Sequence, residues 1–313
     1  MKKLILSLVL LAYFGIQANA AYMLIPMDEK QRNHLKAYGI MYYVLEKEVE
    51  GYWMLNYRGG SFAFKHTSLF EELCKVRDVS YEVIADAKFA KIRTEIGNPE
   101  VNQEIVKLEV APKIAVYTPD VDQKGKEIQP WDDAVTLVLT YAEIPYETVY
   151  DKEVLEDKLA EYDWLHLHHE DFTGQYGKFY ASYGSQAWYK NNVKRMEDLA
   201  ESLGYEKVSK LKLDVVKNIR EYVVGGGFMF AMCSATDTYD IALAADGVDI
   251  CSKVYDGDPQ DPNAQSKLDF EKTFAFKGFK LKSNPLEYEY STIDRPRAPV
   301  IDEKIDYFTL FDF

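Results

Sequence analysis

Beyond residue 112 of this chain of 313 residues, short apolar runs alternate with stretches in which apolar residues have helical spacing. Short runs rich in β-branched and aromatic residues predict four buried strands, which begin near residues 113, 146, 163 and 227. Stretches with amphipathic spacing predict helices over residues 131–142, 152–162, 188–203, 208–223 and 236–245. Strands that alternate with helices indicate an α/β fold with a parallel sheet. We therefore expect a doubly wound, flavodoxin-like domain over residues 112–313.

The region before residue 112 has a different pattern, which indicates a separate small α+β domain over residues 21–111. Apolar stretches at 41–49 and 51–64 predict two strands, and Gly59 and Gly60 fit a turn within the second stretch. Helices are expected over residues 28–40, 67–77 and 85–97. Near the other end of the chain, residues 247–268 predict a long polar loop and residues 270–276 a further strand.

Residues 1–20 have the three parts of a cleavable signal peptide. Lys2 and Lys3 precede a charge-free apolar run over residues 4–16, and Ala18-Asn19-Ala20 provides the small residues that signal peptidase recognises. The apolar run is shorter than the roughly 20 residues that a transmembrane helix needs. We therefore expect cleavage after Ala20 and a periplasmic or secreted protein without a membrane span.

Composition and charge narrow the classes of partner. The formal net charge of −14 argues against nucleic acid and against anionic membrane surfaces. The hydrophobic content of 47% is ample for a packed core. The three cysteines, Cys74, Cys233 and Cys251, are too few for a disulfide scaffold, and at least one of them is unpaired within a monomer. The classes of ligand that composition and charge leave open are small molecules, glycans and peptides.

The candidate catalytic and ligand-binding residues lie in two segments at the ends of expected strands. Open α/β sheets bind ligands at the carboxyl ends of their strands, and this rule selects residues 165–171 and 232–237. We expect the two segments to face one cleft. Cys233 lies at a strand-to-helix turn, where the helix N-terminus favours a thiolate and a nearby oxyanion. It is the candidate nucleophile, and a buried structural cysteine is the alternative.

The histidines of the first segment have three interpretations. His168 or His169 acts as the base for Cys233, or the stretch from His166 to Asp171 binds a metal, or the rings only satisfy hydrogen bonds at a strand end. Strand alternation places His166 and His168 on one face and His169 on the other. We expect no cofactor. The candidate ligand-contacting residues are Glu170, Asp171, Gly174, Ser234, Thr236 and Asp237.

Three segments resemble the class I glutamine amidotransferase-like fold: KIAVYTPD at 113–120, DWLHLHHEDFTG at 163–174, and GGGFMFAMCSATDTYDIALA at 225–244. Together with LNYRGGSFAF at 55–64, they make the chain similar to a family of exported Bacteroidetes proteins commonly labelled asparagine synthetase B. The fold resemblance implies an elbow cysteine, which Cys233 matches, and a downstream His-x-Glu. No histidine follows His169. We therefore expect that the chain, which ends in IDYFTLFDF, is truncated at its C-terminus.

The activity in that family label is not expected of this chain. A true asparagine synthetase has an N-terminal cysteine and a nucleotide-binding domain, whereas signal cleavage leaves Ala21 first and no phosphate-binding loop is present. The preferred hypothesis is a Cys-dependent hydrolase or amidase. One alternative is metal-assisted hydrolysis through residues 166–171. Another is a non-catalytic carbohydrate- or peptide-binding module of the cell envelope that uses Tyr176, Tyr180, Tyr183 and Trp188.

Overall fold

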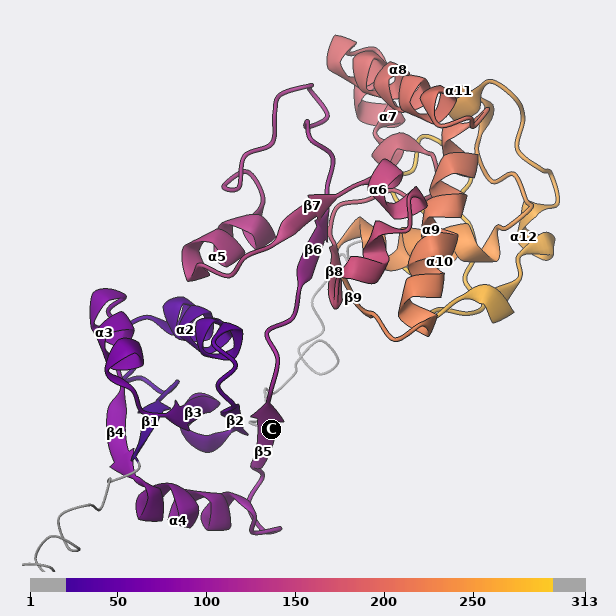
Figure 1. The fold of residues 1–313 in the computed structure, drawn as a ribbon. Helices are drawn as coiled ribbons and strands as arrows, with labels where there is room; N and C mark the ends of the chain where they lie inside the picture. The colour runs from indigo at the N-terminus through magenta and orange to yellow at the C-terminus, as the bar shows by residue number, and fades with distance from the viewer. Residues whose placement is uncertain (1–20, 295–313) are drawn as a thin grey trace, which may run out of the picture. The chain divides into compact units, whose positions relative to one another are not determined.

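The computed structural model describes residues 21–294, so the expected signal peptide and the C-terminal residues 295–313 lie outside the described residues. The described chain divides into two compact units. Unit 1 holds residues 21–111 together with Leu137–Ile144, and unit 2 holds Pro112–Thr136 together with residues 145–294. Each unit has its own sheet, so the protein is a mixed α/β chain with one antiparallel and one parallel sheet (Figure 1).

Unit 1 is built on a five-stranded antiparallel sheet with the order β4-β1-β3-β2-β5. The expected turn joins β2 to β3 through a 3₁₀ turn, η1 (Tyr57–Gly59), and Gly59 and Gly60 have φ of 79° and 91°, which glycine adopts without strain. The strands are β1 (Ala21–Ile25), β2 (Gly51–Leu55), β3 (Ser61–Lys65), β4 (Glu82–Ala85) and β5 (Glu104–Leu108).

Helices cover both faces of this antiparallel sheet. Helices α2 (His34–Glu46) and α3 (Ser68–Val76) pack on one face with Phe62 and Phe64, and α4 (Asp86–Ile96) packs on the other. The expectation of a strand over 41–49 is wrong, because α2 continues to Glu46 with buried apolar residues along its inner side. A short apolar run does not by itself distinguish a strand from a buried helical turn.

Unit 2 is built on a four-stranded sheet in which every neighbouring pair is parallel. The order is β7-β6-β8-β9, which is 2-1-3-4 when the strands of this unit are counted along the chain. The strands are β6 (Ile114–Tyr117), β7 (Glu147–Val149), β8 (Trp164–Leu167) and β9 (Phe228–Ala231). This arrangement confirms that the two candidate segments follow neighbouring parallel strands.

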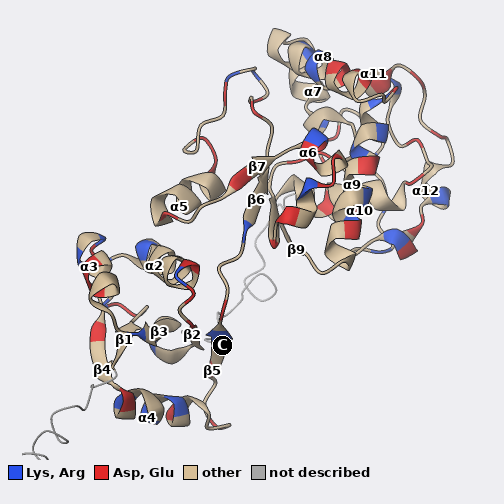
Figure 2. Cartoon of the chain, viewed as in Figure 1, with Lys and Arg blue, Asp and Glu red and all other residues tan. Residues whose placement is uncertain are grey.

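The connections between these strands contain the expected helices, with shifted bounds. Helix α5 (Ala134–Ala142) follows β6, and the expected single helix after β7 is divided into α6 (Asp151–Leu155) and the 3₁₀ turn η2 (Lys158–Glu161). Between β8 and β9 lie η3 (Tyr176–Lys178), α7 (Tyr180–Tyr183), α8 (Ala187–Ser202) and α9 (Val208–Val224), and α10 (Ser234–Ala244) follows β9. Basic and acidic residues are interspersed on α8 and α9 (Figure 2).

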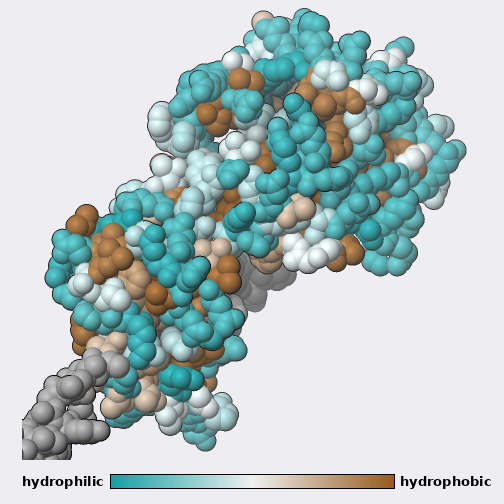
Figure 3. All heavy atoms as spheres, in the orientation of Figure 1, coloured by the Kyte–Doolittle hydropathy of each residue, from teal (hydrophilic) through white to brown (hydrophobic). Residues whose placement is uncertain are grey.

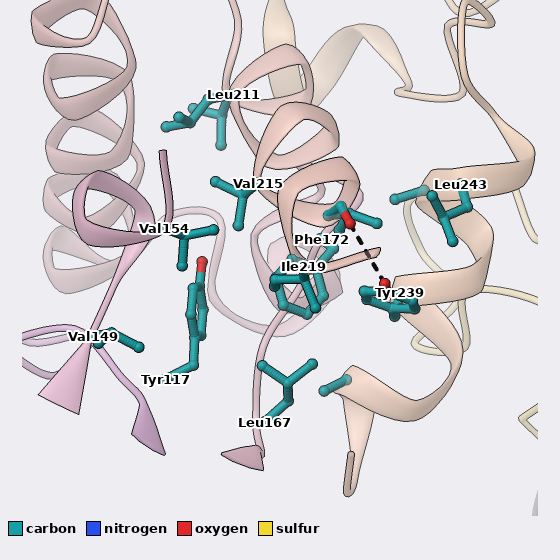
Figure 4. Packing of buried hydrophobic residues seen from close by; sticks show 14 of the residues in the cluster. Tyr117, Val149, Val154, Leu167, Phe172, Leu211, Val215, Ile219, Tyr239 and Leu243 are labelled. Carbon is teal, nitrogen blue, oxygen red and sulfur yellow. Dashed lines mark hydrogen bonds between the residues drawn. The ribbon is translucent and has the colours of Figure 1, made fainter. Parts of the chain in front are cut away.

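The core of unit 2 lies between one face of the sheet and helices α6, α9 and α10. Tyr117, Val149 and Leu167 point from the strands toward Leu211, Val215 and Ile219 of α9 and toward Tyr239 and Leu243 of α10 (Figure 4). The hydroxyl of Tyr239 donates a hydrogen bond of 3.5 Å to the carbonyl oxygen of Val216, drawn as a dashed line in Figure 4. This layer holds the carboxyl ends of β6, β8 and β9 in a fixed register.

The opposite face of the parallel sheet is more open at its β9 side. Phe228 and Phe230 are 59% and 46% exposed, although His166 of the adjoining β8 is buried. The ring of Phe230 stacks on His166 with centroids 5.7 Å apart, and Phe228 meets Trp164 edge-on. Elsewhere the side of unit 2 that Figure 3 presents is mostly hydrophilic, with small separate apolar areas.

The last described part of unit 2 consists of short turns. The expected strand over 270–276 is wrong, because η4 (Phe270–Lys272) is a 3₁₀ turn and Asp240 of α10 accepts hydrogen bonds from three backbone N–H groups of residues 274–276. Residues 247–268 include two one-turn helices, α11 (Lys253–Asp256) and α12 (Ala264–Lys267). Across residues 21–294, every helix is too short or too polar to cross a bilayer.

Candidate active site

The carboxyl ends of β8 and β9 bring the two candidate segments together. Leu167 pairs with Ala231, and the pairing continues past the strands, because Met232 N donates to Leu167 O (2.9 Å). The first turn of α10 then binds the other segment, since Ala235 N donates to His168 O at 3.2 Å. Backbone hydrogen bonds therefore hold Cys233 and His168 on adjoining turns.

Cys233 occupies a strained turn between β9 and α10. Its φ is 51° and its ψ is −134°, a conformation that residues with a Cβ rarely adopt. Such a conformation costs about 1–3 kcal/mol, and it persists where the surrounding structure requires it. A sharp strand-to-helix turn of this kind raises a nucleophile above the sheet edge. The Cys233 side chain is exposed, whereas Cys74 and Cys251 are buried, and all three are free.

Cys233 opens onto a cleft of about 820 Å³ that is lined entirely by residues of unit 2. This volume is that of a typical small-ligand site. The cleft collects most of the candidate residues from both segments. Those among its walls are His168, His169, Glu170, Asp171, Gly174, Cys233 and Ser234, while His166, Thr236 and Asp237 are not.

His168 is held by a carboxylate that sequence inspection did not select. Its Nδ1 lies 2.7 Å from Oδ2 of Asp133, which precedes α5. The other oxygen of Asp133 accepts the backbone N–H groups of Val135 and Thr136, at 2.7 and 3.3 Å. Burial raises the pKa of Asp133, but the His168 ring and these N–H groups outweigh it and leave the pKa below its usual value. A carboxylate on Nδ1 orients the ring and leaves Nε2 for proton transfer.

The ring of His169 lies beside that of His168, with centroids 3.5 Å apart. Its Nε2 is 3.9 Å from Oδ2 of Asp133. The expectation that His169 faces away from His168 is wrong, because β8 ends at Leu167 and strand alternation no longer applies beyond it. Burial, and then the nearby His168, hold the pKa of His169 below its usual value.

His166 belongs to the sheet rather than to the cleft. It is buried within β8, and its Nε2 has no hydrogen-bond partner within residues 21–294. Burial holds its pKa below the usual value, which favours the neutral ring. The structure therefore places His166 in a packing role against Phe230, with its ring centroid 6.0 Å from that of His168.

The two acidic residues after the histidines differ in what they bind. Asp171 organises the following loop, because its oxygens accept hydrogen bonds from the Thr173 N–H, the Thr173 hydroxyl and the Gly177 N–H. Glu170 is fixed through its backbone, since the Thr238 hydroxyl donates to Glu170 O at 2.9 Å. Glu170 is among the residues that line the cleft, and burial raises the pKa of its carboxyl group to about 7.

A buried charged cluster lies next to Glu170, and sequence inspection did not select it. Lys212 of α9 is 1% exposed and donates to Asp151 Oδ1 (2.9 Å), the Tyr117 hydroxyl (3.0 Å) and the Tyr150 hydroxyl (3.2 Å). The Tyr117 hydroxyl in turn donates to Asp151. Burial lowers the pKa of Lys212, but the Asp151 charge outweighs it and keeps the ammonium ionised. Among these four residues, Tyr117, Tyr150 and Lys212 line the cleft.

The remaining candidates have structural positions around the cleft. Gly174 has a φ of 79° and passes so close to α9 that a Cβ would lie 2.8 Å from the Ser209 backbone. Thr236 N donates to Cys233 O (3.1 Å). Asp237 is buried, with Oδ2 unpartnered within residues 21–294, and burial together with the Asp294 charge raises its pKa to about 7. Ser234 begins α10 directly after Cys233.

The aromatic residues proposed for ligand binding mostly pack on one another. Tyr183 contacts Trp188 with ring centroids 5.1 Å apart, and Tyr180 meets Tyr255 edge-on. Of the four, only Tyr176 is among the residues that line the cleft. Outside the cleft, Tyr183 is 42% exposed, so a binding role for these rings stays a prediction.

A second acidic cluster in unit 2 already contains its own cation. The ammonium of Lys207 bonds Asp249, Asp256 and Asp258 at 2.5 to 2.9 Å. Asp249 and Asp256 also lie near the buried Cys251, in a group that could otherwise ligate a metal ion. Because Lys207 neutralises these carboxylates, the cluster is explained as an ion-pair network that ties α9 to the loop around α11.

Comparisons with protein-family models, with curated proteins and with solved structures found no match to this chain.

Proposed function

We propose that this protein is a Cys-dependent hydrolase that acts on amides, with Cys233 as nucleophile. The observation that carries the proposal is the strained turn at Cys233, which opens onto the same cleft as the His168–Asp133 pair. A nucleophile at a strand-to-helix turn, a ring to take its proton and a carboxylate to orient that ring are the three parts of an acyl-transfer site.

In the proposed reaction, His168 Nε2 takes the Cys233 thiol proton and the thiolate attacks the carbonyl carbon of the amide. The tetrahedral oxyanion receives hydrogen bonds from backbone N–H groups at the start of α10. The C–N bond then breaks, the amine leaves with the proton from His168, and a thioester remains on Cys233. Water, deprotonated by His168, hydrolyses the thioester and restores the thiol.

The approach of His168 to Cys233 belongs to the substrate-bound state in this proposal. Within residues 21–294, no hydrogen bond joins Cys233 Sγ to a histidine ring, while backbone bonds hold the two residues on adjoining turns. Catalytic hydrogen bonds often tighten only when substrate is bound.

We also propose that unit 2 is a doubly wound, flavodoxin-like domain related to the class I amidotransferase-like fold. The 2-1-3-4 order of its parallel strands supports this, because flavodoxin-like sheets have the order 2-1-3-4-5. In this proposal His168, which lies upstream of Cys233, takes the role that a downstream histidine has in class I amidotransferases. We further propose export after cleavage following Ala20, which agrees with chemistry that needs no ATP.

The test is hydrolysis of a panel of peptide and amino-acid amides by the protein beginning at Ala21. We expect Cys233→Ala to lower the rate at least 10³-fold and His168→Asn about 10²–10⁴-fold. Asp133→Asn should lower the rate at least tenfold, because the ring loses its orienting carboxylate. The control is Asp120→Asn, which removes one negative charge from the exposed rim of the same cleft. Activity that survives Cys233→Ala would overturn the proposal.

A second candidate function, metal-assisted hydrolysis, rests on a separate observation. The ligand atoms of Asp133, His168 and His169 all lie within 4.8 Å of one another, which suits a Zn²⁺ ion with an open fourth position. The set differs from the one expected from sequence, since His166 and Glu170 are not part of it.

Metal analysis separates the two functions. If the metal mechanism is correct, the purified protein binds about one zinc per chain, a chelator abolishes hydrolysis, and His169→Ala loses zinc and activity together. Cys233→Ala would then retain activity. The cysteine mechanism predicts the opposite pattern, in which a chelator leaves the rate unchanged and Cys233→Ala abolishes it.

A further inference from the structure

Glu170 is a half-buried acidic residue that lines the cleft beside Cys233. Within residues 21–294, the structure records no hydrogen bond and no ion pair to the Glu170 carboxyl group, although its backbone is fixed by Thr238. The residue lies two positions after His168 and lines the same cleft as Cys233. A substrate whose scissile bond meets Cys233 therefore has Glu170 within reach of the groups next to that bond.

The neighbouring carboxylates are already used by the protein itself. Asp133 binds His168 and caps α5, and Asp171 holds the loop through Thr173 and Gly177. Asp151 is paired with Lys212. Glu170 is thus the exception among the acidic residues clustered at this end of the cleft.

Lys212 attracts the Glu170 charge, but no hydrogen bond or ion pair joins the two side chains within residues 21–294. Lys212 has three ammonium hydrogens, and Asp151, Tyr117 and Tyr150 accept them. The buried cluster is therefore complete without Glu170, and its one positive charge is already balanced by Asp151. A carboxylate left in a partly buried cleft without a partner favours a cationic ligand, because the ligand removes the cost of its desolvation.

The walls around Glu170 suit the stem of a basic side chain as well as its charge. Phe179, Met196 and Leu199 line the cleft with Glu170. These partly buried apolar side chains accommodate aliphatic carbons. The cleft thus offers an apolar wall that leads to a negative charge.

From this arrangement we infer that Glu170 forms a specificity subsite for a positively charged group, an ammonium or guanidinium, on the acyl part of the amide substrate. The inference rests on the proposed function and names its substrate class: amides and peptides with a lysine- or arginine-like residue at the scissile bond. Glu170 selects the substrate, while Cys233 and His168 perform the reaction.

The experiment compares kcat/KM for fluorogenic amides of arginine, lysine, norleucine, citrulline and glutamate. We expect the chain from Ala21 onward to prefer arginine or lysine over norleucine by about 30-fold, as for a desolvated charge pair. Glu170→Gln should reduce this preference to about threefold or less, mainly by lowering kcat/KM for the arginine and lysine amides. The control Asp120→Asn, on the exposed rim of the cleft, should keep the preference.

A covalent probe gives a readout that needs no turnover. Arginine and norleucine chloromethyl ketones alkylate a thiolate, forming a C–S bond as chloride leaves. We expect the arginine probe to label Cys233 about 30-fold faster, and Glu170→Gln to remove the difference. Equal labelling of the wild type by the two probes, or a preference for glutamate amides, would overturn the inference while Cys233-dependent hydrolysis still stands. Absence of any Cys233-dependent hydrolysis would overturn the proposed function itself.

Discussion

At the scale of the residue, the backbone conformation of Cys233 lets us predict the relative stability of two Cys233 variants, whether or not the protein is an enzyme. Glycine adopts a φ of 51° and a ψ of −134° without steric strain, because it has no Cβ. Alanine has a Cβ and therefore keeps the same conformational strain as cysteine. We expect Cys233→Gly to be more stable than Cys233→Ala by about 1 kcal/mol, despite the greater chain entropy of glycine. Urea unfolding of the two variants measures the difference.

Ser234 provides the matched control, because it is the next residue and begins a regular helix. There glycine should be less stable than alanine, by up to about 1 kcal/mol. If Cys233→Gly and Cys233→Ala differ in the same direction as the Ser234 pair, the turn is not strained and the nucleophile argument loses its main support.

The raised pKa of the buried Asp237 carboxyl group predicts how the free energy of unfolding depends on pH. Its pKa of about 7 in the folded state lies above the value of about 3.9 in an unfolded chain, so the folded state binds its proton more tightly. This contribution to stability is present at low pH and is lost as pH rises from about 4 to 7. Asp237→Asn removes that dependence, so its unfolding free energy relative to the wild type should increase by up to about 3 kcal/mol between pH 4.5 and 8.

Asp294 tests the cause of this shift, because its charge contributes after burial to the raised pKa of Asp237. When Asp294→Asn is already present, adding Asp237→Asn should produce a smaller pH-dependent change in unfolding free energy than it does in the wild type. A difference between Asp237→Asn and the wild type that is flat across this pH range would contradict the assignment.

Residues at strand ends could be selected from sequence, while their partners could not. Cys233 and His168 follow apolar runs, and the general rule for parallel sheets places such residues at one edge. Asp133 and Lys212 meet their partners across 35 and 61 residues of sequence, so their contacts depend on how strands and helices pack. Asp133 did carry a local signal, since an aspartate just before an amphipathic helix is a capping residue.

At the scale of secondary-structure elements, the pair Lys212–Asp151 joins α9 to α6 inside the core. Removal of one partner leaves a buried charge without compensation, which typically costs 3–5 kcal/mol. We therefore expect Lys212→Met to lower the unfolding free energy by about 3–5 kcal/mol in urea titrations. Asp151→Asn should also destabilise the protein, because Lys212 is then the unpaired charge.

The double variant distinguishes a pairwise interaction from two separate effects. Lys212→Met combined with Asp151→Asn removes both charges, so its loss should be smaller than the sum of the two single losses by at least about 1 kcal/mol. An exposed ion pair on α8, Lys194 with Asp198, is the control, and its removal should cost less than about 1 kcal/mol. Additive losses at Lys212 and Asp151 would contradict the pairing.

Helices and strands of unit 2 could largely be predicted from spacing, because β6, β8 and β9 have short apolar runs and each long helix has an amphipathic face. The expectation that all four strands are buried is wrong for β9, whose Phe228 and Phe230 are exposed. The prediction failed where an apolar run had no periodic context. Residues 41–49 are mostly the end of α2, and residues 270–276 are held by Asp240 rather than by a neighbouring strand. Local patterns do not contain these tertiary contacts.

At the scale of the whole molecule, the chain enters unit 1 twice. Residues Leu137–Ile144 belong to unit 1 although both neighbouring segments belong to unit 2. Within unit 1 this segment packs on α2, where a Cβ on Gly39 would lie 1.7 Å from the Ala142 carbonyl oxygen. Glu143 adds ion pairs to Lys36 and Arg77. No periodicity indicates such a return, since it depends on a close approach that only a glycine permits.

Gly39→Ala should therefore separate the segment from α2, because the clash is with backbone and cannot be relieved by a change of rotamer. We expect a loss of about 2–3 kcal/mol in unfolding free energy and faster amide exchange in residues 137–144. Gly97 has ordinary φ and looser surroundings, with the nearest atom 3.3 Å from an added Cβ. Gly97→Ala should change stability by less than about 1 kcal/mol. Equal effects at the two glycines, with unchanged exchange in 137–144, would show that the segment does not depend on this contact, and unit 1 would then be complete at residue 111.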